Sequence, residues 1–539
     1  MEIENLDHLG LVAALVDEIG LVELTDELLA PHPLNHISSG QVVKAMILNG
    51  LGFVSAPLYL FSEFFEGKPV EHLLGAGITA AHLNDDRLGR VLDQLFEYGT
   101  TLFFLKVAMQ AVRRFGVNTS QCHLDSTSFA VDGEYRTEAR AEGVSEAEAP
   151  QAIEICRGYS RDHRPELKQF LVNLICSADG GIPVWFKVGS GNETDSQSFA
   201  GLMSDFAEQW QTPALMVADA AFYSEPNLQQ VGSLPWLSRV PQTLKAAQTL
   251  VDSALEPLTE RPCDLDGYQL WEQRHSYAGV EQRWILVESP HRKQSEDWLK
   301  PLEKQEKGLK RSLRQLCSQV FACKPDAMDA LLRFQDALTG YTLTQVALVS
   351  VAAKRSPGRP KRTQPSDSPA LGYQWQATLE RTAEYEAQCQ QRHRRFILAT
   401  NVLDDDTYPA QRLLQEYKAQ QHVERGFRFL KDPLFFTSSV FVKKPQRVEA
   451  LALVMALTLL VYSLGQRKLR AQLAQADKTV LDQKQRPTRS PTFRWILQKF
   501  QAIHLVSIGS SQQVSNLSEE RSKIVRLMGF PACRYYLLN

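Results

Sequence analysis

Residues 170–188 read Phe-Leu-Val-Asn-Leu-Ile-Cys-Ser-Ala-Asp-Gly-Gly-Ile-Pro-Val-Trp-Phe-Lys-Val, and this stretch decides the fold class. The nearly continuous apolar run at 170–177 is typical of a buried strand. Asp179-Gly180-Gly181 then favours a tight turn, because glycine adopts positive φ without a steric penalty. A second apolar run follows at 182–188. The stretch therefore predicts a β-hairpin inside a sheet.

The flanking segments extend this hairpin into an α/β order. Before it, residues 121–131 alternate between apolar and polar side chains, which predicts another strand. After it, the patterns predict a helix at 196–209, a strand at 214–218, a short helix at 226–231 and a strand at 236–240. A meander of three strands, followed by strands connected through helices, predicts an α/β sheet whose later strands are parallel.

The rest of the chain divides around this core. The α/β order stops after residue 240 and resumes with a strand at 395–400, followed by a helix that begins near Pro409. Between them, strand and helix patterns mix, and the four prolines of 354–371 favour a linker. We predict five segments: a helical N-terminal domain (1–115), the first part of the core (116–240), an insertion domain of strands and helices (241–390), the second part of the core (391–440) and a basic helical C-terminal region (441–539).

Charge is distributed unevenly along the 539 residues. The net charge is −3, but residues 391–539 carry 24 Lys and Arg against 11 Asp and Glu, a balance of +13. Residues 1–390 carry the opposite excess, −16. A basic C-terminal third suggests a polyanionic partner. The alternative is a drift of charge without function, and charge alone does not decide between the two.

Cysteine usage and hydropathy predict a soluble cytoplasmic protein without a membrane span. The eight cysteines are scattered without a Cys-x-x-Cys pair, which is typical of free thiols in a reducing compartment. The N-terminus, Met-Glu-Ile-Glu-Asn, is acidic where a secretory signal would be basic. The longest apolar run, 450–464, is too short to cross a bilayer and predicts a buried core helix.

Three carboxylates stand out by their positions. Asp125 lies within the predicted strand 121–131, and Asp219 directly follows the strand 214–218, at the carboxyl end where open α/β sheets build their sites. Glu424 lies in the helix after the insertion. Each alone is more simply a turn or cap residue. Together, on neighbouring elements, they would suit divalent cations, which take oxygen ligands.

The helix around Glu424 combines aromatic, acidic and basic side chains. Tyr417, Gln420, Glu424 and Lys431 are spaced by three, four and seven residues, so one helical face would carry all four, with Arg428 one turn away. A separate apolar face holds Val423, Phe427 and Leu430. Such a face suits a metal ligand flanked by phosphate contacts, although a solvated surface helix would look similar.

Together these motifs resemble those of bacterial insertion-sequence transposases of the DDE type, in the superfamily marked by a Tyr-(2)-Arg-(3)-Glu-(6)-Lys signature. Tyr417, Glu424 and Lys431 match its spacing. Residues 219–223, Asp-Ala-Ala-Phe-Tyr, resemble the motif around the second aspartate of that family, and Asp125-Ser-Thr resembles the motif around the first. Residues 158–167 are also similar to this group, and the resemblance covers roughly 118–440.

The resemblance implies an RNase H-like catalytic core, interrupted by a largely β insertion. It implies that Asp125, Asp219 and Glu424 bind two Mg²⁺ (or Mn²⁺) ions, which stabilise the attacking and leaving oxygens of phosphoryl transfer. The expected activity is cleavage of element ends and strand transfer into target DNA. The expected partner is double-stranded DNA, held by a homodimer in the synaptic complex.

The sequence departs from the signature at one position and offers further DNA contacts at others. Gln420 stands where the signature has arginine, so a cation expected near the phosphates is missing there. Arg161 and Arg164, before the second strand, are candidates for phosphate contacts alongside Tyr417, Arg428 and Lys431. Arg359, in the Gly-Arg-Pro of 358–360, resembles an AT-hook core that could enter a minor groove, although a flexible basic linker is the simpler interpretation.

Three other functions stay open at this point. An RNase H-like nuclease without strand transfer would carry the same triad. A domesticated transposase-derived DNA-binding protein would have lost catalysis, and Gln420 keeps this alternative alive although the triad is intact. A sugar hydrolase would use paired carboxylates, but the basic C-terminal third favours nucleic acid.

Overall fold

The computed structural model describes residues 1–30, 36–53, 61–133, 135, 151–160, 164–211, 214–253, 265, 267–293, 297–352, 371–432 and 442–538. They form two compact units. Unit 1 consists of Met1–Ser238, Ser276–Gln282 and Thr400–Asn539, and unit 2 of Arg239–His275 and Arg283–Ala399. The division of the chain into five functional segments stays a prediction.

The sheet of unit 1 has the order β4-β3-β2-β5-β6. Its strands are β2 (Gln121–Val131), β3 (Lys168–Ser177), β4 (Pro183–Gly189), β5 (Leu215–Ala218) and β6 (Trp236–Arg239). β2, β3 and β4 form an antiparallel meander, whereas β5 pairs parallel with β2 and β6 parallel with β5. This mixed order confirms the α/β prediction and is that of an RNase H-like fold.

Helices cover both faces of this sheet, which explains why its strands are apolar on both sides. On β4, Trp185 donates a 3.3 Å hydrogen bond to Gln209 of α8 (Asp195–Trp210). The next residue, Phe186, contacts Phe104 of α7 (Thr100–Phe115), with ring centroids 5.5 Å apart. Because successive side chains of a strand point to opposite faces, α8 and α7 lie on opposite sides of the sheet.

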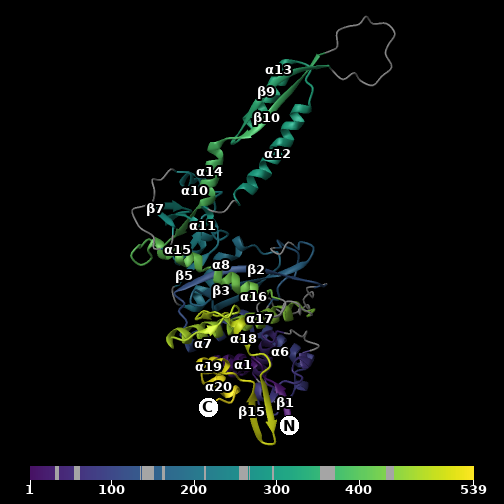
Figure 1. Cartoon of the computed structure of the whole chain (residues 1–539), viewed down its shortest axis with the longest axis vertical. Coiled ribbons are helices and arrows are strands. Elements are labelled where there is room, and N and C mark those ends of the chain that lie inside the picture. Colours follow the sequence, from purple (N-terminus) through teal and green to yellow (C-terminus); the bar gives the residue numbers. More distant parts are fainter. Residues whose placement is uncertain are drawn as a thin grey trace, which may run out of the picture. The chain divides into compact units, whose positions relative to one another are not determined.

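The longest helix, α17 (Pro445–Gln475), is the core of unit 1 (Figure 1). Its length and its mean hydropathy of 2.0 would suffice to cross a membrane, but 89% of that apolar window is buried inside the protein. The buried core helix expected at 450–464 is therefore confirmed. α17 packs against α6 (Asp85–Tyr98), α7 and β4, so it joins the terminal helices to the sheet.

The two ends of the chain fold together. The remaining helices of unit 1 are α1 (Leu9–Ile19), α2 (Leu21–Leu29), α3 (Ser39–Gly50), α4 (Phe61–Phe64), α5 (Val70–Leu74), the 3₁₀ turn η2 (Ala80–His82), α9 (Glu225–Val231), α15 (Ala410–Ala419), α16 (Gln421–Leu430), α18 (Phe493–Lys499), α19 (Glu519–Met528) and α20 (Phe530–Tyr535). Helices from both ends, α1 and α20 among them, share one hydrophobic core with α17.

The C-terminal segment, expected to be helical, also contains strands. These are the short pair β12 (Val480–Leu481) and β13 (Pro487–Thr488), and the hairpin β14 (His504–Ile508) and β15 (Ser511–Ser515). β14 also pairs antiparallel with β1 (Glu2–Asn5), with Glu2 opposite Ser507. The prediction was wrong here because β1 and β14 are short and their partners lie at opposite ends of the chain.

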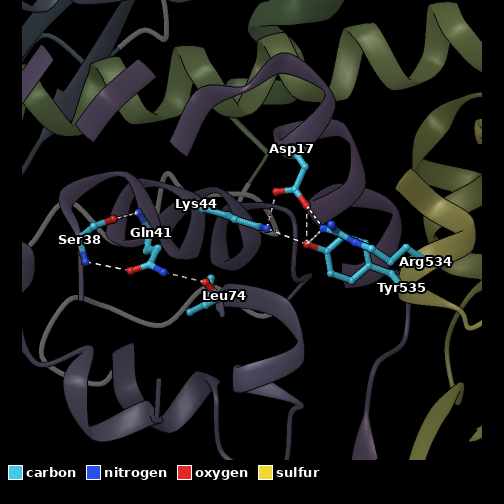
Figure 2. A network of polar contacts seen from close by, with 7 residues as sticks. All are labelled: Asp17, Ser38, Gln41, Lys44, Leu74, Arg534 and Tyr535. Atoms are coloured by element: carbon cyan, nitrogen blue, oxygen red, sulfur yellow. Dashed lines mark hydrogen bonds and ion pairs between the residues drawn. The ribbon is translucent and has the colours of Figure 1, made fainter. Parts of the chain in front are cut away.

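A polar network with Lys44 and Tyr535 as its buried members joins α1, α3 and α20 (Figure 2). Asp17 accepts hydrogen bonds from Lys44 (2.6 Å), Tyr535 (2.6 Å) and Arg534 (2.7 Å). Lys44 also donates to the Tyr535 hydroxyl at 2.8 Å, and only 5% of the Lys44 side chain is exposed. Burial lowers the pKa of Lys44 and raises that of Tyr535. The network therefore depends on the Asp17 carboxylate for its charge balance.

Part of the charge excess of the C-terminal third is neutralised by acidic residues from the rest of the chain. Four of its cations form ion pairs with carboxylates of residues 1–390: Arg447–Asp93, Arg467–Asp179, Lys468–Glu18 and Arg534–Asp17. The uneven distribution of charge thus has a structural explanation that the sequence analysis did not consider. It weakens the inference that the whole basic segment faces a polyanion.

Unit 2 contains both strands and helices. Its strands are β7 (Gln269–Tyr277), β8 (Val280–Glu288), β9 (Tyr341–Ala352), β10 (Leu371–Arg381) and β11 (Arg395–Thr400), and its helices are α10 (Lys245–Asp252), α11 (Pro290–Lys293), α12 (Leu299–Ser318), α13 (Lys324–Asp336) and α14 (Ala383–Arg394). β9 and β10 form an antiparallel hairpin, on which α12 and α13 pack. Between α12 and α13, Phe321 forms an isolated antiparallel bridge with Tyr373 of β10.

Candidate active site

Asp125 and Asp219 occupy equivalent positions on adjacent parallel strands. The ladder between β2 and β5 runs from Gln121–Leu215 to His123–Val217. Asp125 lies two residues beyond His123, and Asp219 lies two residues beyond Val217. Neighbouring strands are about 4.8 Å apart, and residues two positions further on point to the same face. The register therefore directs both carboxylates to the same side of the sheet.

The main chain holds each aspartate close to its strand. The Ser126 N–H donates to Asp125 Oδ1 at 2.8 Å, and the Ala221 N–H donates to Asp219 Oδ1 at 2.9 Å. Both aspartates are half-buried, Asp125 in the middle of β2 and Asp219 directly after β5, and the other residues of these strands are mostly buried. A carboxylate in such a place needs hydrogen bonds or a cation, because its desolvation is otherwise costly.

The loop that follows Asp219 is fixed by residues from three other segments. Ser238 on β6 donates from its hydroxyl to the Asp219 carbonyl at 2.8 Å, and Asn227 donates to the Phe222 carbonyl at 3.0 Å. Tyr223 is buried, and its hydroxyl donates to Gln282 at 2.5 Å. Phe222 is also buried, with its ring centroid 5.7 Å from that of Trp236, so the Phe and Tyr of the 219–223 motif both anchor the loop.

Sequence reasoning missed the partners of those anchors. Gln282 supports Tyr223 through the hydrogen bond, and the Tyr277 ring stacks on Tyr223 with centroids 5.5 Å apart. Both lie in the short segment Ser276–Gln282 that returns to unit 1 from within the predicted insertion. A single glutamine in a strand-like stretch gives no sequence signal of this role, and neither does Ser238.

Glu424 lies in the first turn of α16 and is exposed. The single helix predicted from Pro409 onward is two helices, divided at Gln420, where Val423 N–H bonds the Gln420 carbonyl three residues back. In an unbroken helix of 100° per residue, the apolar side of α15 and that of α16 would point roughly 120° apart. The break at Gln420 changes the direction of the chain, so that α15 and α16 can each bury their apolar side. Tyr417 is therefore on α15, and the face predicted to hold all four signature positions does not belong to one helix.

α16 packs between the sheet and α17 (Figure 1). Gly426 approaches α17 so closely that a Cβ there would lie 3.2 Å from Leu459, and the Phe429 ring meets Tyr462 at 4.3 Å. At its other side, the Lys431 ammonium lies 5.7 Å from the centre of the Phe129 ring of β2. α16 thus lies against the strand that carries Asp125, with its polar side exposed.

The structure does not gather the three predicted catalytic carboxylates into one ligand group. Over the described ranges, no three His, Cys, Asp or Glu side chains are close enough to hold a metal ion. Asp125 and Asp219 are brought to matching positions, and Glu424 lies on the helix next to β2. Their convergence stays a prediction.

Among the predicted DNA contacts, those on α16 stand in the most basic surroundings. Arg425 and Arg428 are exposed, and Tyr417 and Lys431 are half-buried. Burial lowers the pKa of Arg470 on α17, and the charge of Arg425 lowers it further. Arg425 and Arg470 therefore lie close enough for their charges to interact.

The other predicted contacts are less informative. Arg164 forms an exposed ion pair with Glu166 and would have to break it to contact a phosphate. An exposed ion pair contributes little to stability in water, so breaking it would cost little. Arg161 and Arg359 lie outside the described residues.

The motif at 158–167 begins at a close approach of two main chains. A Cβ on Gly158 would lie 1.8 Å from the Gly191 carbonyl oxygen, so only glycine fits there. Gln169 of β3 donates to the carbonyls of Gly191 (2.8 Å) and Tyr159 (3.1 Å). The motif is thus tied to the start of β3, and its tyrosine is exposed.

Comparison with known proteins agrees with this fold. A domain of unknown function (DUF4277) matches residues 1–109, and no curated protein matches the sequence. A solved cryo-EM structure titled as a piggyBac transposase synaptic complex with hairpin DNA aligns over 93% of this chain and 83% of that chain, with 9% identity and a TM-score of 0.36, a likeness too slight to carry an argument. The family described as "Transposase DDE domain" matches residues 120–461, more than half of the sequence. The chain therefore belongs to the transposase DDE domain family and is a DNA transposase.

Proposed function

We propose that this transposase cuts the ends of an insertion sequence and joins them to target DNA at a site formed by Asp125, Asp219 and Glu424. The observation that carries the proposal is the matching register of Asp125 and Asp219 on β2 and β5. Carboxylates at matching places on neighbouring parallel strands can share a divalent cation, since such cations take oxygen ligands.

The donor set fits the divalent ions that this family normally uses. Carboxylate oxygens are the ligands that Mg²⁺ and Mn²⁺ prefer, and two bound ions would supply charge stabilisation for an in-line displacement at phosphorus. Glu424 is the third ligand in the proposal. The packing of α16 against β2 supports this role, because it puts the glutamate on a helix beside the strand of Asp125.

The chain's own residues would hold the DNA and the aspartates in place. Arg428 and Lys431, on the helix of Glu424, would contact phosphates next to the reacting bond, with Tyr417 nearby on α15. The anchored loop after Asp219 would keep that carboxylate still while DNA enters. Fixed ligands matter because small displacements of reacting groups slow phosphoryl transfer strongly.

The natural setting of the activity is part of the proposal. The protein would act in the bacterial cytoplasm, on double-stranded DNA, as a homodimer that holds two element ends in a synaptic complex. The coarser statement, a soluble enzyme that cuts and joins DNA, follows from the family.

The test is a set of charge-removing variants in a DNA cleavage and joining assay. Asp125→Asn, Asp219→Asn and Glu424→Gln should each abolish cleavage in Mg²⁺ or Mn²⁺ while duplex binding persists. Calorimetric titration with Mn²⁺ should show weaker binding in each variant. The matched control is Asp205→Asn, an exposed aspartate whose ion pair with Lys187 is on the surface.

Two results would contradict the proposal. Cleavage by any one of the three variants at the wild-type rate would remove that residue from the site. Cleavage without any joining to target DNA, under conditions where ends are paired, would indicate a nuclease without strand transfer.

A further inference from the structure

Helix α12 of unit 2 carries a line of cations along one side. Lys300, Lys304, Lys307, Arg311 and Arg314 are all exposed, and they are spaced by four, three, four and three residues. That spacing returns to the same side of an α-helix at each step. We refer to these five residues as the basic stripe. At 1.5 Å per residue it is about 21 Å long.

The opposite side of α12 packs against the β9–β10 hairpin, which fixes the direction of the stripe. Leu302 and Leu313 are buried, and Leu309 and Leu316 belong to the same small core with Tyr341 and Leu379 of the hairpin. At 100° per residue these leucines lie roughly opposite the stripe. The stripe therefore faces away from the hairpin.

The cations of the stripe are mostly not paired with carboxylates, although Glu303 lies one helical turn before Lys307. Lys300 pairs with Asp297 at 2.8 Å, but in the described part of unit 2 the other four cations have no carboxylate within ion-pair distance. Like charges three or four residues apart destabilise a helix by about 0.2–0.5 kcal/mol per pair. α12 contains four such neighbouring pairs within the stripe. The stability of α12 alone would favour a mixture of acidic and basic side chains at these positions.

A neighbouring helix of the same unit shows the mixed pattern. On α13, Arg333 pairs with Asp329 one turn earlier at 2.7 Å, and Asp326 lies in the first turn, where an acid suits the helix dipole. The contrast between α12 and α13 argues that the stripe is not an ordinary solvated surface.

We infer that the basic stripe of α12 binds the phosphate backbone of duplex DNA, as a second contact surface separate from α16. It rests on the proposed function in taking duplex DNA as substrate, and it does not depend on the metal site. A DNA strand presents one phosphate per 3.4 Å of helix axis, so the stripe spans about six phosphates of one strand. Gly308, Ser312 and Gln315 flank the stripe without any large apolar side chain, so the surface does not suit insertion into a membrane.

The test compares two variants of the full chain that lose the same charge. The stripe variant carries Lys304→Gln, Lys307→Gln, Arg311→Gln and Arg314→Gln. The control variant carries Lys245→Gln, Lys310→Gln, Lys324→Gln and Arg333→Gln, which are also exposed cations of unit 2. Binding of a random-sequence DNA duplex longer than the stripe is measured by fluorescence anisotropy over a salt series in EDTA, so that no cleavage occurs.

In the stripe variant, the slope of log K against log salt should fall in magnitude by about three to four, since each lost phosphate contact removes about 0.9. The control slope should stay within one unit of wild type. Circular dichroism should show the helix retained, because glutamine is a good helix former. If the fourfold variant does not fold, the pairs Lys304/Lys307 and Arg311/Arg314 are neutralised separately, each with an expected fall of about two.

Three outcomes would overturn the inference. Equal slopes for wild type and stripe variant would show that α12 does not touch DNA. Equal loss in both variants would reduce the effect to net charge. Loss of binding to phosphatidylserine vesicles, with DNA binding unchanged, would assign the stripe to a membrane surface. A wild-type protein that does not bind duplex DNA at all would instead count against the proposed function.

Discussion

The hydroxyl of Ser238 on β6 donates a 2.8 Å hydrogen bond to the main-chain carbonyl of Asp219, on the loop after β5. Ser238 is completely buried, and its strand is the parallel neighbour of the strand that leads to Asp219. A side chain on one strand therefore fixes the position of a carboxylate on the next, without being part of the site.

Removing that hydroxyl should loosen Asp219. Ser238→Ala should lower folding stability by about 1 kcal/mol and raise the metal concentration needed for half-maximal cleavage about tenfold, the usual effect of losing a residue that supports a ligand. The measurement is cleavage rate against Mg²⁺ concentration. Ser204→Ala, which removes a hydroxyl bonded within α8, is the control. A fall in rate that excess Mg²⁺ does not restore would argue against a positioning role.

The exposed side of α16 should contact DNA phosphates. Arg428→Ala and Lys431→Ala should each reduce the magnitude of the salt slope of duplex binding by about 0.9, on every sequence alike, because phosphate contacts carry no base information. Arg489→Ala is the control, since Arg489 belongs to the same basic third of the chain but pairs with Asp477. Salt titration by anisotropy measures the slopes. Unchanged slopes and cleavage in both variants would show that this helix does not meet the backbone.

Loss of the Asp17 carboxylate should destabilise unit 1. Asp17→Asn leaves the buried Lys44 ammonium without its counter-charge, and breaking a buried pair from one side costs about 3–5 kcal/mol. Urea unfolding gives the free energy directly. The exposed pair Lys187–Asp205 supplies the comparison, because Asp205→Asn should cost no more than about 1 kcal/mol. Similar costs for the two variants would mean that the network of Figure 2 is not a determinant of stability.

His8 should make folding sensitive to acid. Burial lowers its pKa from 6.5 to about 4, while its Nε2 lies 2.7 Å from the Leu51 carbonyl, so the folded protein favours the neutral ring. The unfolded chain takes up the proton first as pH falls. The stability from the neutral ring is thus present above pH 6.5 and is lost between pH 6.5 and 4, by at most about 3 kcal/mol.

Replacing His8 should flatten that dependence. His8→Gln keeps an N–H for Leu51 and removes the titration, so the difference in unfolding free energy between wild type and variant should change over pH 4–6.5 and stay constant above it. His36→Gln, which replaces an exposed histidine, is the control variant. A constant difference over the whole range would show that His8 does not titrate differently in the two states.

Local pattern was sufficient to predict most of the sheet. β2 and β11 have the predicted bounds, and β3 to β6 differ by one or two residues at their ends. The bounds could be predicted because a run of apolar residues marks the buried part of a strand. The same reasoning selected Asp125 and Asp219 as candidates, since a carboxylate at a fixed place on an apolar strand can be recognised without knowing its neighbours in space.

Partners and angles between elements could not be predicted. The pairing of β1 with β14, the hydrogen bond of Ser238 to Asp219 and the ion pair of Arg467 with Asp179 each join segments far apart in sequence. The division of the helix at Gln420 depends on which core each apolar side meets. The spacing of apolar residues along the chain shows which face of a helix is buried, but it does not show which other element covers that face.

The pairing of β1 with β14 has a consequence for synthesis. β1 cannot form its pairing until β14 has been synthesised, since Glu2 pairs with Ser507. The same holds for the packing of α1 on α20. At roughly 5–20 residues per second, a ribosome needs about half a minute to two minutes to supply them. Until then the apolar sides of the first helices lack their cover. A chain interrupted during translation therefore lacks part of the hydrophobic core of unit 1 and exposes apolar surface that chaperones and proteases recognise.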